Sequence, residues 1–298
     1  MHYSVKRLIS IAGAGLFFSY WMSLGVFAAE KIDVFVSILP LKYFVEQVGG
    51  DFGNVSVMVK PGADPHTYEP KPKQMVSLSK ATAYFTIGIT FEDVWLPKFK
   101  AANPKMVIIH ADENIEKIPM KTHSFYPRSD HDHGLLDPHV WTSPLLVKTI
   151  CKNILNGLIK IDAARQSIYT AHHRTFEKKI GRIHGELQSI FAGKKGLSFM
   201  VFHPAWGYFA DQYNLQQIAV QVGGQDPSPS ELVDLINTAK AENIHVIFIQ
   251  PSFSTTSVNA LSKEIDAEII TVDPLAENWL ENLKIVADAF SAALTIQP

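Results

Sequence analysis

The chain alternates short apolar runs with longer stretches in which apolar residues recur every three or four positions. Short apolar runs bounded by glycine, proline or polar clusters predict strands, and the wider spacing predicts amphipathic helices. In the first half, strands are predicted at Ile32–Ile38, Val55–Val59, Ala83–Ile87 and Met106–Ile109, with helices at Leu41–Val48, Lys73–Lys80 and Phe91–Ala101. This alternation is typical of a parallel sheet with helices on both faces.

The same alternation returns in the second half of the chain. Strands are predicted at Leu197–Phe202, Gln217–Val220, Ile244–Ile249 and Glu268–Val272, with helices at Pro229–Asn243, Ser254–Ile265 and Trp279–Leu294. Two helices, Leu145–Ile161 and Arg165–Phe191, lie between the halves, and the second would be about 40 Å long. We therefore expect an α/β fold with an N-terminal lobe at residues 29–164, a linking helix at 165–193 and a C-terminal lobe at 194–298.

The N-terminus has the pattern of a secretory signal. Lys6 and Arg7 precede an apolar stretch, and Val26 and Ala28 supply the small residues that signal peptidase requires. We expect residues 1–28 to be a signal peptide, cleaved after Ala28. The alternative is an uncleaved anchor, because about 20 apolar residues can span a bilayer. No cysteine follows the stretch for lipid attachment, so we expect a soluble protein in a periplasm.

Composition narrows the function classes. Of the 298 residues 47% are hydrophobic and 19% charged, as in a globular protein, and the formal net charge is −2. Proteins that grip nucleic acid or an anionic membrane need a strong basic excess, so we expect neither partner. The one cysteine, Cys151, excludes an internal disulfide and a cysteine-based metal cluster.

Four residues beside prolines are the candidates for chemistry. His66 and His139 each end an Asp-Pro-His triplet, and Pro follows both His203 and Asp273. Proline stiffens the backbone around it, and ligands of open parallel sheets bind at the carboxyl ends of the strands. Three imidazoles and a carboxylate suit zinc, whereas manganese favours more oxygen ligands. On these patterns alone, a shared metal site and four structural loop residues remain equal alternatives.

The segments around these residues resemble the zinc/manganese-binding proteins of ABC importers, the group often called ZnuA/TroA-like. The resemblance rests on Pro65–Pro70, Asp137–Trp141, Phe202–Ala210 and Asp273–Ala276, which follow one another in the family's order, and on the loop Gly223–Glu231. It implies two Rossmann-like lobes, one long rigid helix, and a metal in the cleft between the lobes. It also implies that His66, His139, His203 and Asp273 are the ligands.

The resemblance further implies a periplasmic solute-binding protein that delivers its ion to a membrane permease. Family members that favour manganese often carry glutamate where His203 stands, so the histidine favours zinc, with manganese as the alternative. Zinc members often carry a long histidine-rich loop, whereas the loop at 111–137 holds only His123, His131 and His133. We expect that loop to be solvated, with weak binding of a second ion as the alternative.

Transport requires no catalysis, and we expect a monomeric carrier that is not an enzyme. A secreted zinc-dependent hydrolase is the alternative function, but the chain has no His-Glu-x-x-His helix and no nucleophile elbow. A side role as an adhesin stays open. Metal binding needs neutral imidazoles, so affinity should fall below about pH 6.5. We expect His172, His173 and His184 of the long helix to be solvated.

Overall fold

The computed structural model describes residues 31–120, 136–221, 225–251 and 256–295. The predicted signal peptide and the loop histidines His123, His131 and His133 lie outside this part of the chain. By its internal contacts, the chain from Lys31 onward forms one compact unit. Within the described ranges, no helix combines the length and apolar character needed to cross a membrane.

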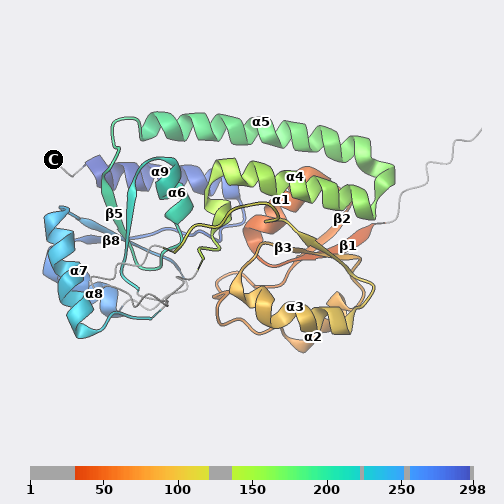
Figure 1. Ribbon diagram of the computed structural model, residues 1–298, viewed down its shortest axis with the longest axis horizontal. Helices are drawn as coiled ribbons and strands as arrows, with labels where there is room; N and C mark the ends of the chain where they lie inside the picture. The colour runs from red at the N-terminus through yellow and green to blue at the C-terminus, as the bar shows by residue number, and fades with distance from the viewer. Residues whose placement is uncertain (1–30, 121–135, 222–224, 252–255, 296–298) are drawn as a thin grey trace, which may run out of the picture. The chain divides into compact units, whose positions relative to one another are not determined.

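The N-terminal lobe is built on a four-stranded parallel sheet. Its strands are β1 (Ile32–Val36), β2 (Gly53–Val57), β3 (Ala83–Thr86) and β4 (Val107–His110), in the order β2-β1-β3-β4. Its helices are α1 (Leu39–Gly49), α2 (Pro72–Leu78), α3 (Thr90–Ala102) and α4 (Pro144–Ile161). In Figure 1, α2 and α3 lie on one side of the sheet and α1 and α4 on the other. Every residue of β3 is buried, as expected of a central strand covered on both faces.

The C-terminal lobe repeats this topology. Its strands are β5 (Ser198–Val201), β6 (Gln216–Ala219), β7 (Val246–Ile249) and β8 (Glu268–Thr271), all parallel, in the order β6-β5-β7-β8. Its helices are α6 (Gly207–Gln212), α7 (Pro229–Ala241), α8 (Thr256–Ile265) and α9 (Trp279–Thr295). Two equivalent α/β lobes confirm the predicted fold class. The short helix α6 was not predicted, because six residues are too few to show helical periodicity.

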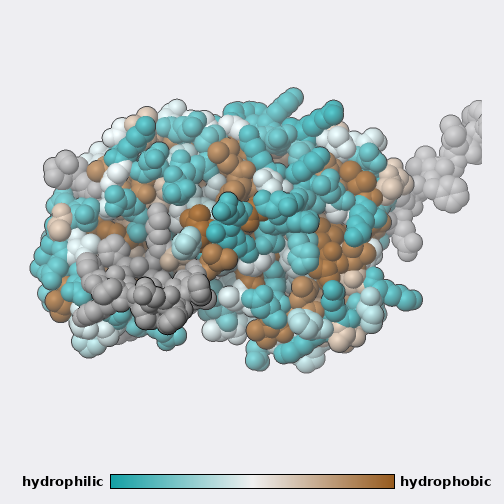
Figure 2. All heavy atoms as spheres, in the orientation of Figure 1, coloured by the Kyte–Doolittle hydropathy of each residue, from teal (hydrophilic) through white to brown (hydrophobic). Residues whose placement is uncertain are grey.

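One long helix packs against both lobes. It is α5 (Gln166–Ile190), entered through a short 3-10 helix, η2 (Ala163–Arg165). It packs against α1 and α4 of the N-terminal lobe and against α9 of the C-terminal lobe (Figure 1). Tyr169, Phe176, Ile180 and Leu187 form its buried stripe at helical spacing. In Figure 2, hydrophilic residues cover most of the upper edge where α5 lies, so this helix presents a polar face outward.

The expectation that all three helix histidines are solvated is wrong. His173 is only 8% exposed, because it lies four residues after Tyr169 and three before Phe176 and so falls on the buried stripe of α5. The ring of His184 contacts Tyr213, and its Nδ1 lies 2.8 Å from Gln212 Nε2. Helical spacing, which the sequence does contain, identifies the buried histidine.

Two tryptophans join the lobes through reciprocal hydrogen bonds. The indole Nε1 of Trp141, in the short 3-10 helix η1 (Val140–Thr142) ahead of α4, donates to the carbonyl oxygen of Pro274 at 2.8 Å. The indole Nε1 of Trp279, at the start of α9, donates back to the carbonyl oxygen of Trp141 at 2.8 Å. The Trp279 ring also packs edge-on against Phe44 of α1, at 5.2 Å between ring centroids. We call Trp141 and Trp279 the indole pair.

Candidate metal site

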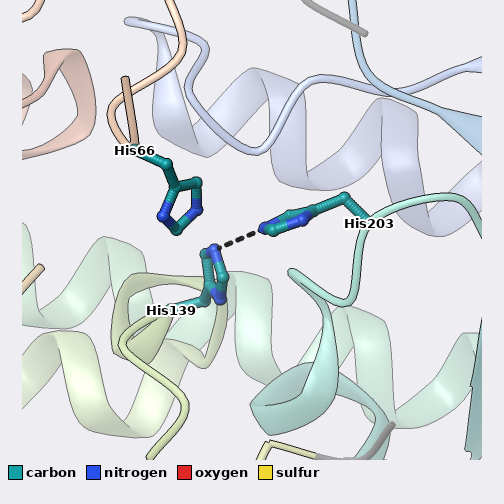
Figure 3. Close-up of side chains that lie close together, drawn as sticks. All are labelled: His66, His139 and His203. Carbon is teal, nitrogen blue, oxygen red and sulfur yellow. Dashed lines mark hydrogen bonds between the residues drawn. The ribbon is translucent and has the colours of Figure 1, made fainter. Parts of the chain in front are cut away.

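Three loops bring three of the predicted residues together (Figure 3). His66 lies between β2 and α2, His139 directly precedes η1, and His203 lies two residues after β5. One ring nitrogen from each histidine lies within 4.8 Å of the other two. His139 and His203 are 5% and 6% exposed, whereas His66 lies at the exposed rim. The N-terminal lobe thus supplies two imidazoles and the C-terminal lobe supplies the third.

Each ring is oriented through its Nδ1 atom. His139 Nδ1 lies 2.7 Å from Asp137 Oδ1, and His203 Nδ1 lies 2.9 Å from Gln221 Oε1. The corresponding atom of His66 lies 3.3 Å from the Thr90 hydroxyl. An oxygen acceptor at Nδ1 fixes the hydrogen there and leaves Nε2 as the atom that can bind a metal.

The Nε2 atoms of His139 and His203 face each other at 3.4 Å (Figure 3). With a hydrogen on each Nδ1, both Nε2 atoms present a lone pair, and two lone pairs at this distance repel unless a positive centre lies near both. A cation coordinated by the three rings satisfies them all. The donor set therefore fits a divalent ion that accepts imidazole ligands.

The Asp-Pro dipeptides build one turn three times. His66 N donates to Asp64 Oδ1 at 2.9 Å, and His139 N donates to Asp137 Oδ1 at 2.9 Å. Leu275 N donates to Asp273 Oδ1 in the same way, at 2.8 Å. An aspartate that accepts from the backbone two residues on makes a compact turn, and the intervening proline restricts it further. These turns fix the backbone at both N-lobe histidines.

The local environment of His203 and His66 favours the neutral form of these two rings. Burial, reinforced by the neighbouring His139, lowers the pKa of His203 to about 3, although the Gln221 amide opposes the shift. Partial burial and the same neighbour lower the pKa of His66, against the opposing charge of Asp64. We predicted that metal affinity falls below about pH 6.5. For His66 and His203, the loss should begin at a lower pH. The reference value on which the prediction rested ignores the cost of burying an imidazolium.

Asp273 does not join the three histidines. No carboxylate oxygen of Asp273 lies within 4.8 Å of all three ring nitrogens. Its side chain instead lines a neighbouring cavity of about 270 Å³, whereas the histidines line a small one of about 20 Å³. Leu275 lines both cavities. Burial raises the pKa of Asp273, with the backbone hydrogen bond from Leu275 acting against the shift.

Sequence reasoning missed the polar residues that surround the histidines. In the C-terminal lobe, a polar residue follows every strand by one or two positions: His203 after β5, Gln221 after β6, Gln250 after β7 and Asp273 after β8. The carboxyl ends of parallel strands share one edge of the sheet, so these side chains gather there. The signal was present in the sequence, but glutamine carries no motif that would have singled it out.

A comparison with protein families shows to which family the chain belongs. The family described as "Zinc-uptake complex component A periplasmic" (ZnuA) matches residues 34–293, which include the three histidines and Asp273.

The chain belongs to this family.

This chain is similar to a solved structure and to curated relatives. The solved structure entitled "Crystal structure of ZnuA" is 42% identical, with a TM-score of 0.83, and the match covers 89% of this chain and 99% of that one. The zinc-binding protein AdcA of Streptococcus pyogenes is 25% identical over 96% of this chain and 59% of its own length. A putative metal-binding protein of Treponema pallidum is 28% identical over 85% of this chain and 82% of its own. The chain thus spans 59% of the first curated relative that it matches.

Proposed function

We propose that this protein is the solute-binding component of an ABC importer, which captures Zn²⁺ outside the inner membrane and delivers it to a membrane permease. The observation that carries the proposal is the convergence of the Nε2 atoms of His139 and His203 at 3.4 Å, with His66 beside them. The family description and the name of the relative AdcA support zinc as the cargo and a periplasm as the place of work. Manganese remains the alternative cargo.

We propose His66, His139, His203 and Asp273 as the ligands. Asp273 would complete the set with Oδ2, because Oδ1 already accepts a hydrogen bond from Leu275 N. The loop that holds Asp273 must move to bring this oxygen to the ion. That loop follows β8, which belongs to the same sheet as β5, the strand that precedes His203. Three imidazoles and one carboxylate favour zinc over manganese. The lobe boundaries at 29–164, 165–193 and 194–298 and the signal peptide at 1–28 belong to the same proposal.

A carrier explains the site better than a hydrolase does. A catalytic zinc needs a general base beside an open coordination position. Among the described residues that line the three-histidine cavity, Asp64 is the one acidic side chain. Its two carboxylate oxygens are engaged by His66 N and by the Thr67 hydroxyl. We therefore propose a carrier that is not an enzyme. We propose further that it is monomeric and binds no nucleic acid.

Competitive titration against a chromophoric chelator tests the proposal. Metal-free protein should bind one equivalent of Zn²⁺ tightly and Mn²⁺ more weakly. His203→Ala should weaken zinc binding by at least about 100-fold, more than the loss of an outer partner typically does. The matched control is His245→Ala, at an exposed position ahead of β7, which should bind as the wild type does. Tighter binding of Mn²⁺ would change the proposed cargo, and binding of neither ion would overturn the proposal.

A further inference from the structure

One buried amide in the three-histidine cavity has no hydrogen-bond partner among the residues that the structure describes. Gln250 directly follows β7, is 7% exposed, and lines the cavity together with His66, His139 and His203. Its Nε2 atom is buried and meets no acceptor in the described part of the chain. Nearly all buried polar groups in proteins are hydrogen-bonded, so an unpaired amide at a cavity wall indicates a missing acceptor.

The other buried glutamines of this lobe show what such a residue normally does. Gln221 Oε1 accepts from His203 Nδ1, and Gln217 Oε1 accepts from Trp206 N at 2.7 Å. Each of these hydrogen bonds satisfies the amide oxygen, although Gln217 Nε2 is also buried without a partner among the described residues. The side chain of Gln250 makes no such bond with the residues that the structure describes, so packing alone does not account for a glutamine there.

Nε2 of Gln250 is a donor that requires an acceptor. Once an ion occupies the lone pairs of the three imidazoles, none of these nitrogens can accept from it. The acceptor that a zinc site with three imidazoles lacks is the oxygen of its fourth ligand. Asp273 is a candidate for this ligand, because it follows β8, which pairs with β7, and Val272 N donates to Ile249 O at 2.8 Å. A water molecule on the ion presents the same chemistry.

We propose that Gln250 is a positioning residue of the metal site, whose amide donates a hydrogen bond to the oxygen ligand that completes the coordination of the ion. This inference rests on the proposed metal-binding function. It assigns Gln250 a role toward the fourth ligand like that of Asp137 and Gln221 toward the histidines. The amide is then satisfied only when the ion and its oxygen ligand are present.

The variant Gln250→Met tests this, because methionine is of similar size and cannot donate. We expect its zinc affinity, measured by chelator competition, to fall by about 10- to 100-fold, as for other outer partners of metal ligands. The visible absorption of the Co²⁺ complex should change as well, because it reports the ligand geometry. The stability of the metal-free protein against denaturant should stay the same or rise, since the change removes an unpaired buried donor.

Gln217→Met provides the matched contrast. It removes an equally buried amide, but one that accepts from Trp206 N, so the metal-free protein should lose stability. A structural role for Gln250 would produce this same loss, with no change in the Co²⁺ spectrum, and would overturn the inference.

The oxygen ligand is identified by repeating Gln250→Met in an Asp273→Ala background. If the effect on zinc affinity disappears there, Gln250 acts on the Asp273 carboxylate, and if it persists, Gln250 acts on a bound water. Unchanged zinc binding by Gln250→Met in both backgrounds would overturn the inference and leave the proposed function intact. Failure of the wild type to bind Zn²⁺ or Mn²⁺ would overturn both.

Discussion

Asp137 makes two hydrogen bonds that both act on one histidine. Its Oδ1 accepts from the backbone nitrogen of His139 and also lies 2.7 Å from that residue's Nδ1. The Tyr208 hydroxyl donates to the carbonyl oxygen of Asp137 at 2.7 Å and ties this loop to α6. One carboxylate, 1% exposed, therefore sets both the backbone and the ring of His139.

Asp137→Asn should lower the zinc affinity by about 10- to 100-fold, because an amide oxygen orients the imidazole less strongly than a carboxylate and adds no basicity. Chelator competition measures the change. Asp64→Asn is the matched control. Asp64 accepts from the backbone of His66, and the described contact of that ring's Nδ1 is with Thr90 and not with Asp64, so a smaller loss is expected. Equal losses in the two variants would contradict the assigned role of the His139 ring contact.

The prolines beside His66, His139, His203 and Asp273 singled out these four residues, and the family resemblance implied that they are ligands. The sequence could not predict the position of the Asp273 carboxylate. In the other two Asp-Pro turns the third residue is a histidine, whereas here it is Leu275, whose backbone nitrogen donates to Asp273 Oδ1. Sequence reasoning also missed Gln221 and Gln250, whose roles depend on the neighbours that folding provides. Side-chain direction at a loop depends on contacts between segments far apart in the chain, which patterns within one segment do not contain.

At the scale of elements, the turn between β3 and α3 depends on a buried acid. Both carboxylate oxygens of Glu92 accept backbone hydrogen bonds, from Ile87 N at 2.9 Å and Gly88 N at 2.7 Å, and the Ser37 hydroxyl donates to the same group. Glu92 is 5% exposed. Burial raises its pKa from 4.5 to about 7, despite these three hydrogen bonds.

This shift predicts a pH-dependent stability. The folded protein favours the protonated carboxyl, so the stabilisation is complete below about pH 4.5 and is lost as pH rises through about 7. Relative to Glu92→Gln, the wild type should lose up to about 3 kcal/mol of unfolding free energy between pH 4.5 and pH 8. Denaturant unfolding at several pH values measures this. Glu264→Gln, at an exposed position of α8, controls for the removal of an acidic group, and a difference between wild type and Glu92→Gln that stays constant with pH would contradict the shift.

The starts of helices were predicted within a few residues where the sequence contains a start signal. Pro72 and Pro144 begin α2 and α4, and the Ser228–Glu231 capping box begins α7. Several predicted strands were one or two residues too long at their carboxyl ends, as at Ile38 and Phe202. These residues remain apolar and buried, but the backbone has already left the sheet to form the loops of the site.

At the scale of the whole described chain, the indole pair connects the two lobes next to the three histidines. Trp141 and Trp279 are 2% and 3% exposed, and each indole donates to a carbonyl across the lobes. Pro274, which accepts one of these bonds, also lines the three-histidine cavity. The hydrogen bonds that hold the lobes together are therefore also part of the wall of the candidate site.

Trp279→Phe should destabilise the protein by about 1–3 kcal/mol, because it leaves the carbonyl of Trp141 buried without its donor. Denaturant unfolding followed by far-UV circular dichroism measures the change. Trp95→Phe is the matched control, because Trp95 lies half-buried on α3 and lines neither the lobe contact nor the site. If both variants lost the same stability, the cross-lobe hydrogen bond would have no special weight.

The position of Trp141 places a buried indole beside the candidate metal site. Its ring lies 5.2 Å from the His139 ring, between centroids, and is shielded from solvent. An ion with a partly filled d shell, held at that imidazole, offers the excited indole a route for non-radiative decay, whereas a closed-shell ion such as Zn²⁺ does not. The emission of a single tryptophan therefore distinguishes the chemical kind of ion in the site without any added dye.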